Sequence, residues 1–292
     1  MIQDIAPHKF HNEYRPVPPD GESICLYYSG RKLLLRKDVQ EVNYPTFSEL
    51  ASIPGINVSD LYKNYIYLFT IDDRRFYLGK KEKLPENTGE ESDSTYEWAD
   101  IQICRNGSPK YLCFAGVTGW QLHQWYDNRK FCGRCGHAMV PDDKERMMKC
   151  PECGLMEFPK ICPAVIIAVT HGNRILLSKY AGRTFKKYAL LAGFTEIGET
   201  LEQTVAREVM EEVGLKVKNI TYYKSQPWSF SDTMLSGFYC ELDGTEDVVL
   251  DQEELALAEW YEREDIPVEE EDCSLTNEMI MNFKRGFFGS TP

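Results

Sequence analysis

The segment of residues 193–215, GFTEIGETLEQTVAREVMEEVGL, constrains the fold of this chain more than any other stretch. Thr200 and Gln203 have the spacing of a capping box, and Gly214 suits the position just after a helix. The pattern therefore predicts a strand that ends at Gly193, a short loop, and a helix that begins at Thr200. At about 100° per residue, five apolar residues share one face that we expect to pack on a sheet: Val205, Ala206, Val209, Met210 and Val213.

Three glutamates converge beside that apolar face. Glu208, Glu211 and Glu212 fall within an arc of about 100° on the same count. A solvated acidic face is the usual interpretation of such a cluster. However, carboxylates at this spacing repel one another unless a cation lies among them. Oxygen ligands without a nearby histidine or cysteine select Mg²⁺ or Mn²⁺, so we expect a divalent metal site here.

Four of the ten cysteines form two CxxC pairs, Cys132 with Cys135 and Cys150 with Cys153, separated by fourteen residues. This spacing can place four thiolates tetrahedrally around one Zn²⁺, and the filled ligand set predicts a structural rather than catalytic ion. A redox-active pair is the alternative. The other six cysteines are expected to be small buried hydrophobic residues in a reducing compartment: Cys25, Cys104, Cys113, Cys162, Cys240 and Cys273.

The rest of the chain predicts a mixed α/β (α+β) protein of three parts. Residues 1–128 indicate a β-rich domain with hairpins around residues 29–30 and 72–73 and a helix over residues 117–126. Residues 129–160 form the cysteine segment, and residues 161–292 alternate strands and helices, with an amphipathic helix from Leu275 that Ser274 caps. The first domain offers no nucleophile, phosphate loop or ligand cluster, which suggests a structural or dimerising role.

Charge and hydropathy exclude two classes of function. The formal net charge of −13 argues against non-specific DNA binding, which needs many phosphate-neutralising side chains. The longest apolar run, Ala164–Val169, is far shorter than the roughly 20 residues of a membrane span. The first residues also lack the apolar core of a secretory signal. We therefore expect a soluble, cytoplasmic protein.

The spacing of residues 193–215 resembles the signature of the Nudix hydrolase family, G-x5-E-x7-R-E-U-x-E-E-x-G-U, where U is apolar, and every fixed position is filled. Members of this family hydrolyse nucleoside diphosphates linked to another group, using divalent metals. The resemblance implies an α/β/α Nudix sandwich. It also implies that Glu208, Glu211 and Glu212 hold metal and activate water, while Glu199 and Arg207 orient the loop against the helix.

A second resemblance, covering about residues 126–261, is to the NudC-type NAD(H) pyrophosphatases. These carry a four-cysteine zinc ribbon before the Nudix signature, which we call the box, and the motif SQPWPFPxS after it. In this chain the motif reads SQPWSFSDT, residues 225–233. The resemblance implies that Glu254 is a further metal ligand and that Phe158 packs on substrate. It implies a substrate-contacting segment made of Gln226, Pro227, Trp228, Ser229, Phe230, Ser231, Asp232 and Thr233.

The subfamily resemblance implies hydrolysis of NAD(H) to AMP and nicotinamide mononucleotide, removal of 5′ NAD caps from RNA, and a homodimer. The first domain of this chain, residues 1–128, could itself have a Nudix-like fold that lacks the box. Ser229 and Ser231 replace prolines and Thr233 replaces serine, which predicts a more flexible loop. ADP-ribose or a dinucleoside polyphosphate is therefore an alternative substrate. A non-catalytic nucleotide sensor is a further alternative, against which the intact box argues.

Overall fold

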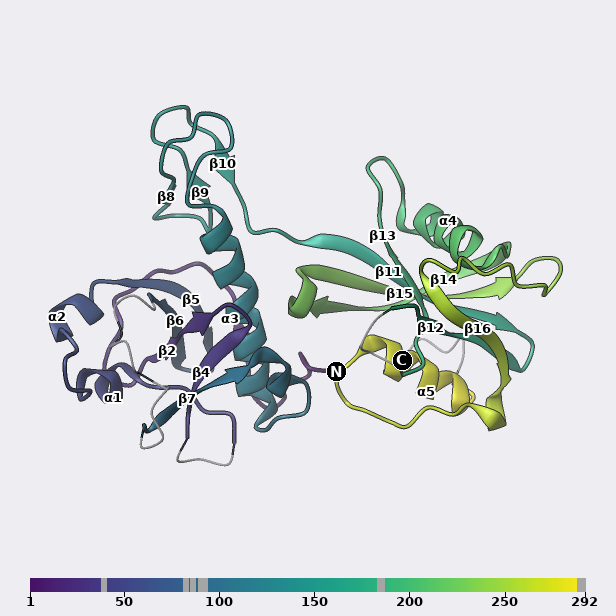
Figure 1. The fold of residues 1–292 in the computed structure, drawn as a ribbon, viewed down its shortest axis with the longest axis horizontal. Helices are drawn as coiled ribbons and strands as arrows, with labels where there is room; N and C mark the ends of the chain where they lie inside the picture. Colours follow the sequence, from purple (N-terminus) through teal and green to yellow (C-terminus); the bar gives the residue numbers. More distant parts are fainter. Residues whose placement is uncertain (38–40, 81–83, 85–87, 89–93, 183–186, 288–292) are drawn as a thin grey trace. The chain divides into compact units, whose positions relative to one another are not determined.

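The computed structural model describes residues 1–37, 41–80, 84, 88, 94–182 and 187–287. The chain divides into two compact units. One comprises residues 2–160 and 229–231, and the other comprises residue 1 together with residues 161–228 and 232–292. Figure 1 labels the elements of both.

Two small sheets and a long helix make up most of the first unit. Its four-stranded sheet has the order β1 (Phe10–His11), β5 (Tyr65–Ile71), β6 (Arg74–Gly79), β2 (Ile24–Leu26). Its three-stranded sheet has the order β3 (Tyr28–Ser29), β4 (Lys32–Arg36), β7 (Tyr96–Asp100). The helices are α1 (Phe47–Ala51), α2 (Val58–Leu61) and α3 (Lys110–Asn128), with a 3₁₀ turn, η2, at Ile101–Arg105.

Both predicted hairpins are confirmed, with one correction. Tyr28 pairs with Leu33, and Ile71 pairs with Arg74, each across a tight turn. The run SICLYY is not one strand, because Ile24–Leu26 pairs in parallel with β6 in the other sheet. The predicted helix at residues 117–126 is also longer, beginning directly after Pro109.

The second unit is built on one mixed sheet. Its strand order is β14 (Val217–Trp228), β15 (Thr233–Leu242), β11 (Cys162–His171), β12 (Arg174–Tyr180), β16 (Leu255–Glu262), and β13 (Leu191–Phe194) also pairs with β11. The pairing of β11 with β15 is parallel, and the other pairings are antiparallel. The helices are α4 (Leu201–Val213) and α5 (Leu275–Lys284), with short 3₁₀ turns η3 (Ser229–Ser231) and η4 (Arg263–Asp265).

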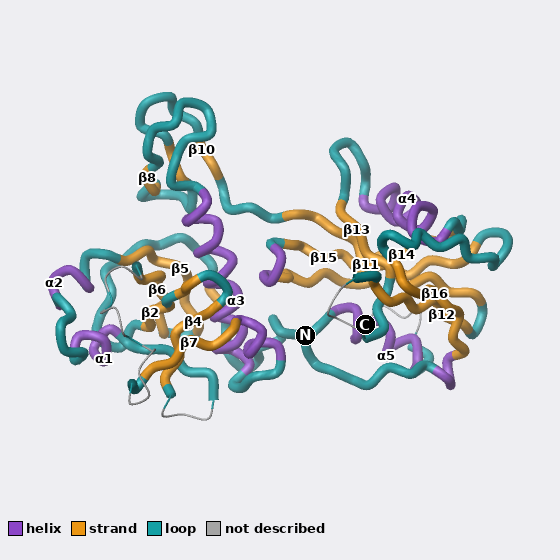
Figure 2. The backbone as a smooth tube through the Cα atoms, in the orientation of Figure 1, coloured by secondary structure: helices purple, strands orange, loops and turns teal. Residues whose placement is uncertain are grey.

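The central strand β11 is apolar on both sides because both faces of the sheet are covered. Val165, Ile167 and Val169 pack in one core with α4. Ile166 and Ala168 point the other way, into the core that α5 covers. Figures 1 and 2 show the two helices on opposite faces of the sheet. The expected α/β/α sandwich is therefore confirmed, and the apolar run that is too short for a membrane is its buried middle strand.

The predicted limits of α4 are confirmed, but the predicted packing face is wrong in part. Thr200 and Gln203 form the expected capping box, and Gly214 ends the helix in a left-handed conformation at φ 68°. Ala206 and Met210, however, face solvent, while Glu208 and Glu212 are buried. The buried face of α4 is therefore rotated toward the glutamates, and Glu208 and Glu212 lie within this face and not at its edge.

Among the helices of the described residues, none has the length and apolar character to span a bilayer.

Replacing Ile167 by alanine tests the two-sided packing of β11. Ile167 is fully buried, so we expect the free energy of unfolding to fall by about 2–5 kcal/mol. Urea denaturation followed by circular dichroism measures this change. Ile161, whose side chain is 59% exposed, supplies the matched control, and Ile161→Ala is expected to change stability by less than about 0.5 kcal/mol. Equal losses in both variants would contradict the assignment of the core.

Candidate active site and metal centre

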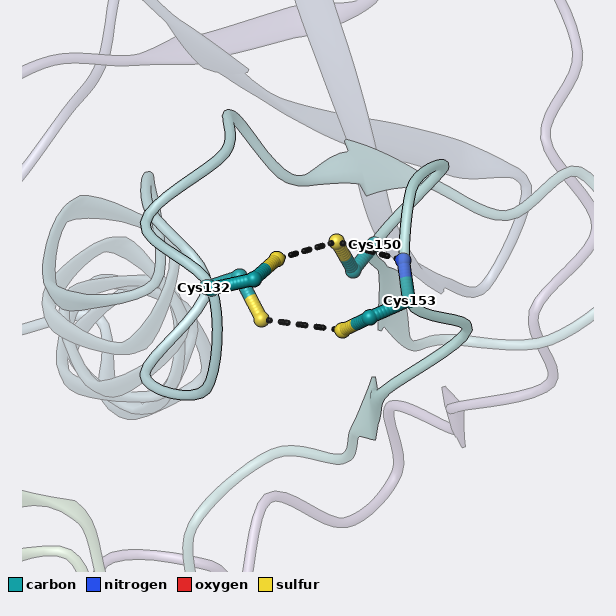
Figure 3. Close-up of side chains that lie close together, drawn as sticks. Cys132, Cys150 and Cys153 are labelled. Atoms are coloured by element: carbon teal, nitrogen blue, oxygen red, sulfur yellow. Dashed lines mark hydrogen bonds between the residues drawn. The ribbon is translucent and has the colours of Figure 1, made fainter.

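The four cysteines of the two CxxC pairs come together in the first unit. The sulfur atoms all lie within 4.8 Å of one another, with Cys132 and Cys153 at 3.5 Å and Cys135 and Cys150 at 3.4 Å. Figure 3 shows Cys132, Cys150 and Cys153 turned toward one point. Four sulfurs around zinc at about 2.3 Å would stand slightly further apart, about 3.8 Å, so the cluster fits one tetrahedral ion.

Tight turns hold the thiols in place. Gly136 and Gly154 adopt left-handed conformations at φ 77° and 72°, and their N–H groups donate to the carbonyls of Cys132 and Cys150. The N–H groups of Arg134 and Cys153 point at cysteine sulfurs at 3.4 Å. The rest of the ribbon is three two-residue strands, β8 (Val140–Pro141), β9 (Met148–Lys149) and β10 (Met156–Glu157), and mostly loop (Figure 2). A segment with so little core depends on its metal for order.

The six other cysteines lie outside this cluster, as expected. Five are buried and Cys162 is half-buried.

The carboxylate site begins with a close approach between β13 and α4. A Cβ atom on Gly193 would lie 1.9–2.2 Å from the carboxylate atoms of Glu208, a distance that real atoms do not reach. Only glycine at this position lets the Glu208 side chain lie across the strand. Glu208 is 9% exposed and Glu212 is 2% exposed, whereas Glu211 faces solvent. Gly193 and Glu208, two fixed positions of the signature, are therefore packed directly against each other.

Arg207 connects the carboxylates. Its Nε and Nη2 donate to the two oxygens of Glu199 at 2.6 and 3.0 Å, and its Nη1 donates to Glu208 at 2.7 Å and Glu211 at 2.9 Å. Nη2 also donates to the carbonyl of Phe194 at 2.9 Å. The guanidinium thereby fastens the loop that carries Glu199 to the helix, as the resemblance implies.

This network shifts the pKa of two of the carboxyl groups in opposite directions. The hydrogen bonds from Arg207 lower the pKa of Glu199 to about 2, so it is ionised at any physiological pH. Burial raises the pKa of Glu208, and the adjacent Arg207 opposes that shift. The negative charges of Glu211 and Glu254 also raise the pKa of Glu208. A divalent cation among these groups would offset their repulsion.

Glu254 is 46 positions from Glu208 along the sequence, and its negative charge is one of the causes that raise the pKa of Glu208. Glu254 is exposed and precedes β16, and its carbonyl accepts a hydrogen bond from Ala181 at 2.9 Å. Glu208, Glu211, Glu212 and Glu254 all offer hard oxygen ligands, which suit Mg²⁺ or Mn²⁺ better than zinc. Within the described residues they are gathered less tightly than the four thiols.

Thr204 contributes to this site and was not identified from the sequence. It is fully buried, and its hydroxyl donates to Glu199 at 3.0 Å and to the carbonyl of Thr200 at 3.1 Å. It thus supports the same carboxylate that Arg207 binds. A polar residue on the buried side of a capped helix is the signal that would have identified it.

The segment of residues 225–233 forms the end of a β-hairpin. Pro227 pairs with Met234 and Trp228 with Thr233, so β14 and β15 continue almost to the turn. Asp232 makes that turn with φ 56°. Ser229 and Ser231, the two serines that replace prolines of the motif, lie in the 3₁₀ turn η3 between the paired strands.

The predicted substrate-contacting side chains differ widely in exposure. Pro227, Trp228, Phe230 and Asp232 are half-buried, Ser229 and Thr233 are buried, and Ser231 is exposed. Phe158 follows β10 in the first unit and is 53% exposed.

Gln226 is fully buried, and its amide bonds the main chain at Cys273 and Leu275. This arrangement does not support the predicted contact of its amide with a substrate.

Two parts of the chain are similar to known protein families. A family model described as the NUDIX domain matches residues 160–283, and one described as the NADH pyrophosphatase zinc ribbon domain matches residues 127–158. Proteins named NAD-capped RNA hydrolase NudC from Citrobacter koseri and from Escherichia coli K12 are each 45% identical over 150 residues. That match covers 51% of this chain and 58% of each relative, so the chain spans a little over half the length of these curated relatives.

Among solved structures, a NUDIX hydrolase from Nitrosomonas europaea is 22% identical, with a TM-score of 0.48. The alignment covers 56% of this chain and 94% of that one.

Replacing a ribbon cysteine tests the zinc centre. We expect Cys150→Ser to lose its bound zinc and to increase hydrogen exchange across residues 131–157, because three ligands hold the ion less tightly than four. Metal analysis of the purified chain and hydrogen–deuterium exchange measure the two effects. Cys162→Ser, outside the cluster, is the matched control and should keep one zinc ion per chain. Undiminished zinc in Cys150→Ser would contradict the assignment.

Replacing Gly193 by alanine tests the close approach to Glu208. The new methyl group must displace the carboxylate, and we expect Mn²⁺ affinity to fall by about 10- to 100-fold. Electron paramagnetic resonance titration with Mn²⁺ measures that affinity. Gly21→Ala is the control, since its Cβ would make only ordinary contacts. Unchanged Mn²⁺ binding in Gly193→Ala would remove Glu208 from the metal site.

Proposed function

We propose that the chain hydrolyses the diphosphate bridge of NAD(H), because residues 160–283 match the NUDIX domain and residues 127–158 match the NADH pyrophosphatase zinc ribbon domain. The products would be AMP and nicotinamide mononucleotide. The observation that carries the proposal is the group of carboxylates around Arg207, which pairs with Glu199, Glu208 and Glu211. The relatives named NAD-capped RNA hydrolase support removal of NAD caps from RNA as the same chemistry.

We propose that Glu208, Glu211, Glu212 and Glu254 hold catalytic Mg²⁺ or Mn²⁺. The bound ions would neutralise the diphosphate and make a water molecule more acidic. Glu211 or Glu212 would take a proton from the attacking water as its oxygen bonds one phosphorus. The bond from that phosphorus to the bridging oxygen would break, and the other phosphate would leave with the bridging oxygen and its electron pair. Arg207 and Glu199 keep the box loop against α4, so the carboxylates stay aligned during the attack.

The aromatic side chains suggest how the dinucleotide is recognised. In the second unit, Trp228 keeps a partly exposed ring that would pack on a base of the substrate. The resemblance assigns a substrate contact to the partly exposed rings of Phe158 and Phe230 as well. It also assigns substrate contacts to Pro227, Ser229, Ser231, Asp232 and Thr233. For a capped RNA, only the 5′ end has to enter this site, which is compatible with a net charge of −13.

The serine replacements favour one second candidate. Without the prolines at positions 229 and 231, the pocket could prefer ADP-ribose or a dinucleoside polyphosphate.

We further propose a homodimer located in the cytoplasm, without DNA or membrane partners. Its proposed domains are residues 1–128, 129–160 and 161–292.

Replacing Glu212 by glutamine tests the catalytic assignment. Glutamine keeps the shape but removes the charge, so we expect turnover of NADH with Mg²⁺ or Mn²⁺ to fall at least about 100-fold while the fold remains. Mass spectrometry of AMP and nicotinamide mononucleotide measures turnover, and circular dichroism checks the fold. Glu202→Gln, exposed on the first turn of the same helix, should retain activity. Full activity in Glu212→Gln would refute the assignment.

The same assay separates the substrates. Faster release of AMP from NADH or from a 5′-NAD RNA than from ADP-ribose supports the proposal. Faster cleavage of ADP-ribose would favour the second candidate. Cleavage of none of them by the folded, zinc-bound chain would favour a nucleotide sensor.

A further inference from the structure

Gln226 stands out in the second unit because both groups of its side-chain amide bond the start of one helix. Its Oε1 accepts from the N–H of Leu275 at 2.7 Å, and its Nε2 donates to the carbonyl of Cys273 at 2.9 Å. The residue is 0% exposed. Leu275 is the first residue of α5, and an N–H at that position has no acceptor within its own helix. A strand side chain therefore completes the cap of a helix far along the sequence.

A second buried carboxamide organises the chain just before that helix. The Oδ1 of Asn277 accepts from the N–H of Glu271 at 2.9 Å, and its Nδ2 donates to the carbonyl of Glu269 at 2.8 Å. Ser274 caps the N–H of Asn277 at 3.3 Å. Residues 269–275 are thus held by side chains from β14 and from α5 itself, so the first turn of α5 is a fixed point.

Close packing prevents α5 from shifting to compensate for a change at its start. A Cβ atom on Gly237, in β15, would lie 2.6 Å from the Sδ of Met279 and 3.2 Å from a methyl carbon of Leu275. Glu278 accepts hydrogen bonds from Tyr223 at 2.8 Å and from Lys224 at 2.7 Å, both in β14. The helix is therefore tied to β14 at two places, and Gln226 makes the tie nearer to the hairpin end.

The geometry of β14 connects this tie to Trp228. Residues two apart in a strand point to the same face, and the register of β14 is regular from Lys224 to Trp228. Gln226 and Trp228 therefore share the face of the sheet that α5 covers. Trp228 is half-buried and is the last residue of the strand.

We propose that Gln226 is a positioning residue: it locks the end of β14 to the first turn of α5 and thereby sets where the Trp228 ring stands. This inference rests on the proposed function, in which Trp228 contacts the dinucleotide. Gln226 then affects substrate binding through Trp228 and does not touch the substrate.

The test is fluorine NMR on the full chain labelled with fluorotryptophan, with the Trp228 resonance assigned from Trp228→Phe. Gln226→Met keeps the approximate volume but removes both hydrogen bonds. We expect it to shift or broaden the Trp228 signal while leaving the signal of Trp260, in β16, unchanged. Gln226→Glu retains an acceptor for Leu275 and should move the signal less, which also serves if the methionine variant does not fold. Gln252→Met, exposed before β16, is the control and should leave Trp228 unchanged.

Kinetics distinguishes positioning from direct contact. We expect KM for NADH to rise about tenfold in Gln226→Met and less in Gln226→Glu, in step with the displacement of the Trp228 signal, with kcat within about twofold of the original. A rise in KM without any movement of Trp228 would show that Gln226 meets the substrate itself and would overturn the proposal. An immobile Trp228 signal in both folded variants would overturn it as well. If the unmodified chain does not cleave NADH, the proposed function fails, while the NMR result still decides the positioning claim.

Discussion

The second unit depends on how three acidic side chains are brought together without a large electrostatic cost. One guanidinium, that of Arg207, bonds Glu199, Glu208 and Glu211 at 2.6–3.0 Å, and Gly193 makes room for the carboxylate of Glu208 against the strand. These two features attach the box loop and α4 to β13. The core beneath, with β11 apolar on both faces, supplies a rigid base for the carboxylates.

In the first unit, the zinc ribbon is limited by the small size of its apolar core. The ribbon has only two-residue strands, so it buries too little apolar surface to order itself. Four thiols within 4.8 Å supply the missing constraint through one metal ion. The chain therefore combines a thiol site for zinc with a carboxylate site that we propose holds Mg²⁺ or Mn²⁺. Soft sulfur ligands close completely around a structural ion, while hard oxygen ligands gather around the proposed catalytic site.

Local signals in the sequence predicted much of this structure. Thr200, Gln203 and Gly214 gave the limits of α4, because capping and left-handed glycine depend on neighbouring residues only. The four zinc ligands of the ribbon were likewise predicted from a local pattern, the spacing of the two CxxC pairs. The buried face of α4 was predicted correctly for Val205, Val209 and Val213 but wrongly for Ala206 and Met210, whose place is taken by the enclosed Glu208 and Glu212. The bond from Gln226 to Leu275 joins residues 49 positions apart, a contact that no local pattern contains.

The most direct test of the central claim is a crystal structure of the chain soaked with Mn²⁺, in which anomalous scattering locates the ions. We expect an anomalous peak among the carboxylates of Glu208, Glu211 and Glu212, with Glu254 as a further ligand. Arg207 would remain bonded to Glu199. A chain that binds Mn²⁺ elsewhere and leaves these glutamates without a peak would contradict the account.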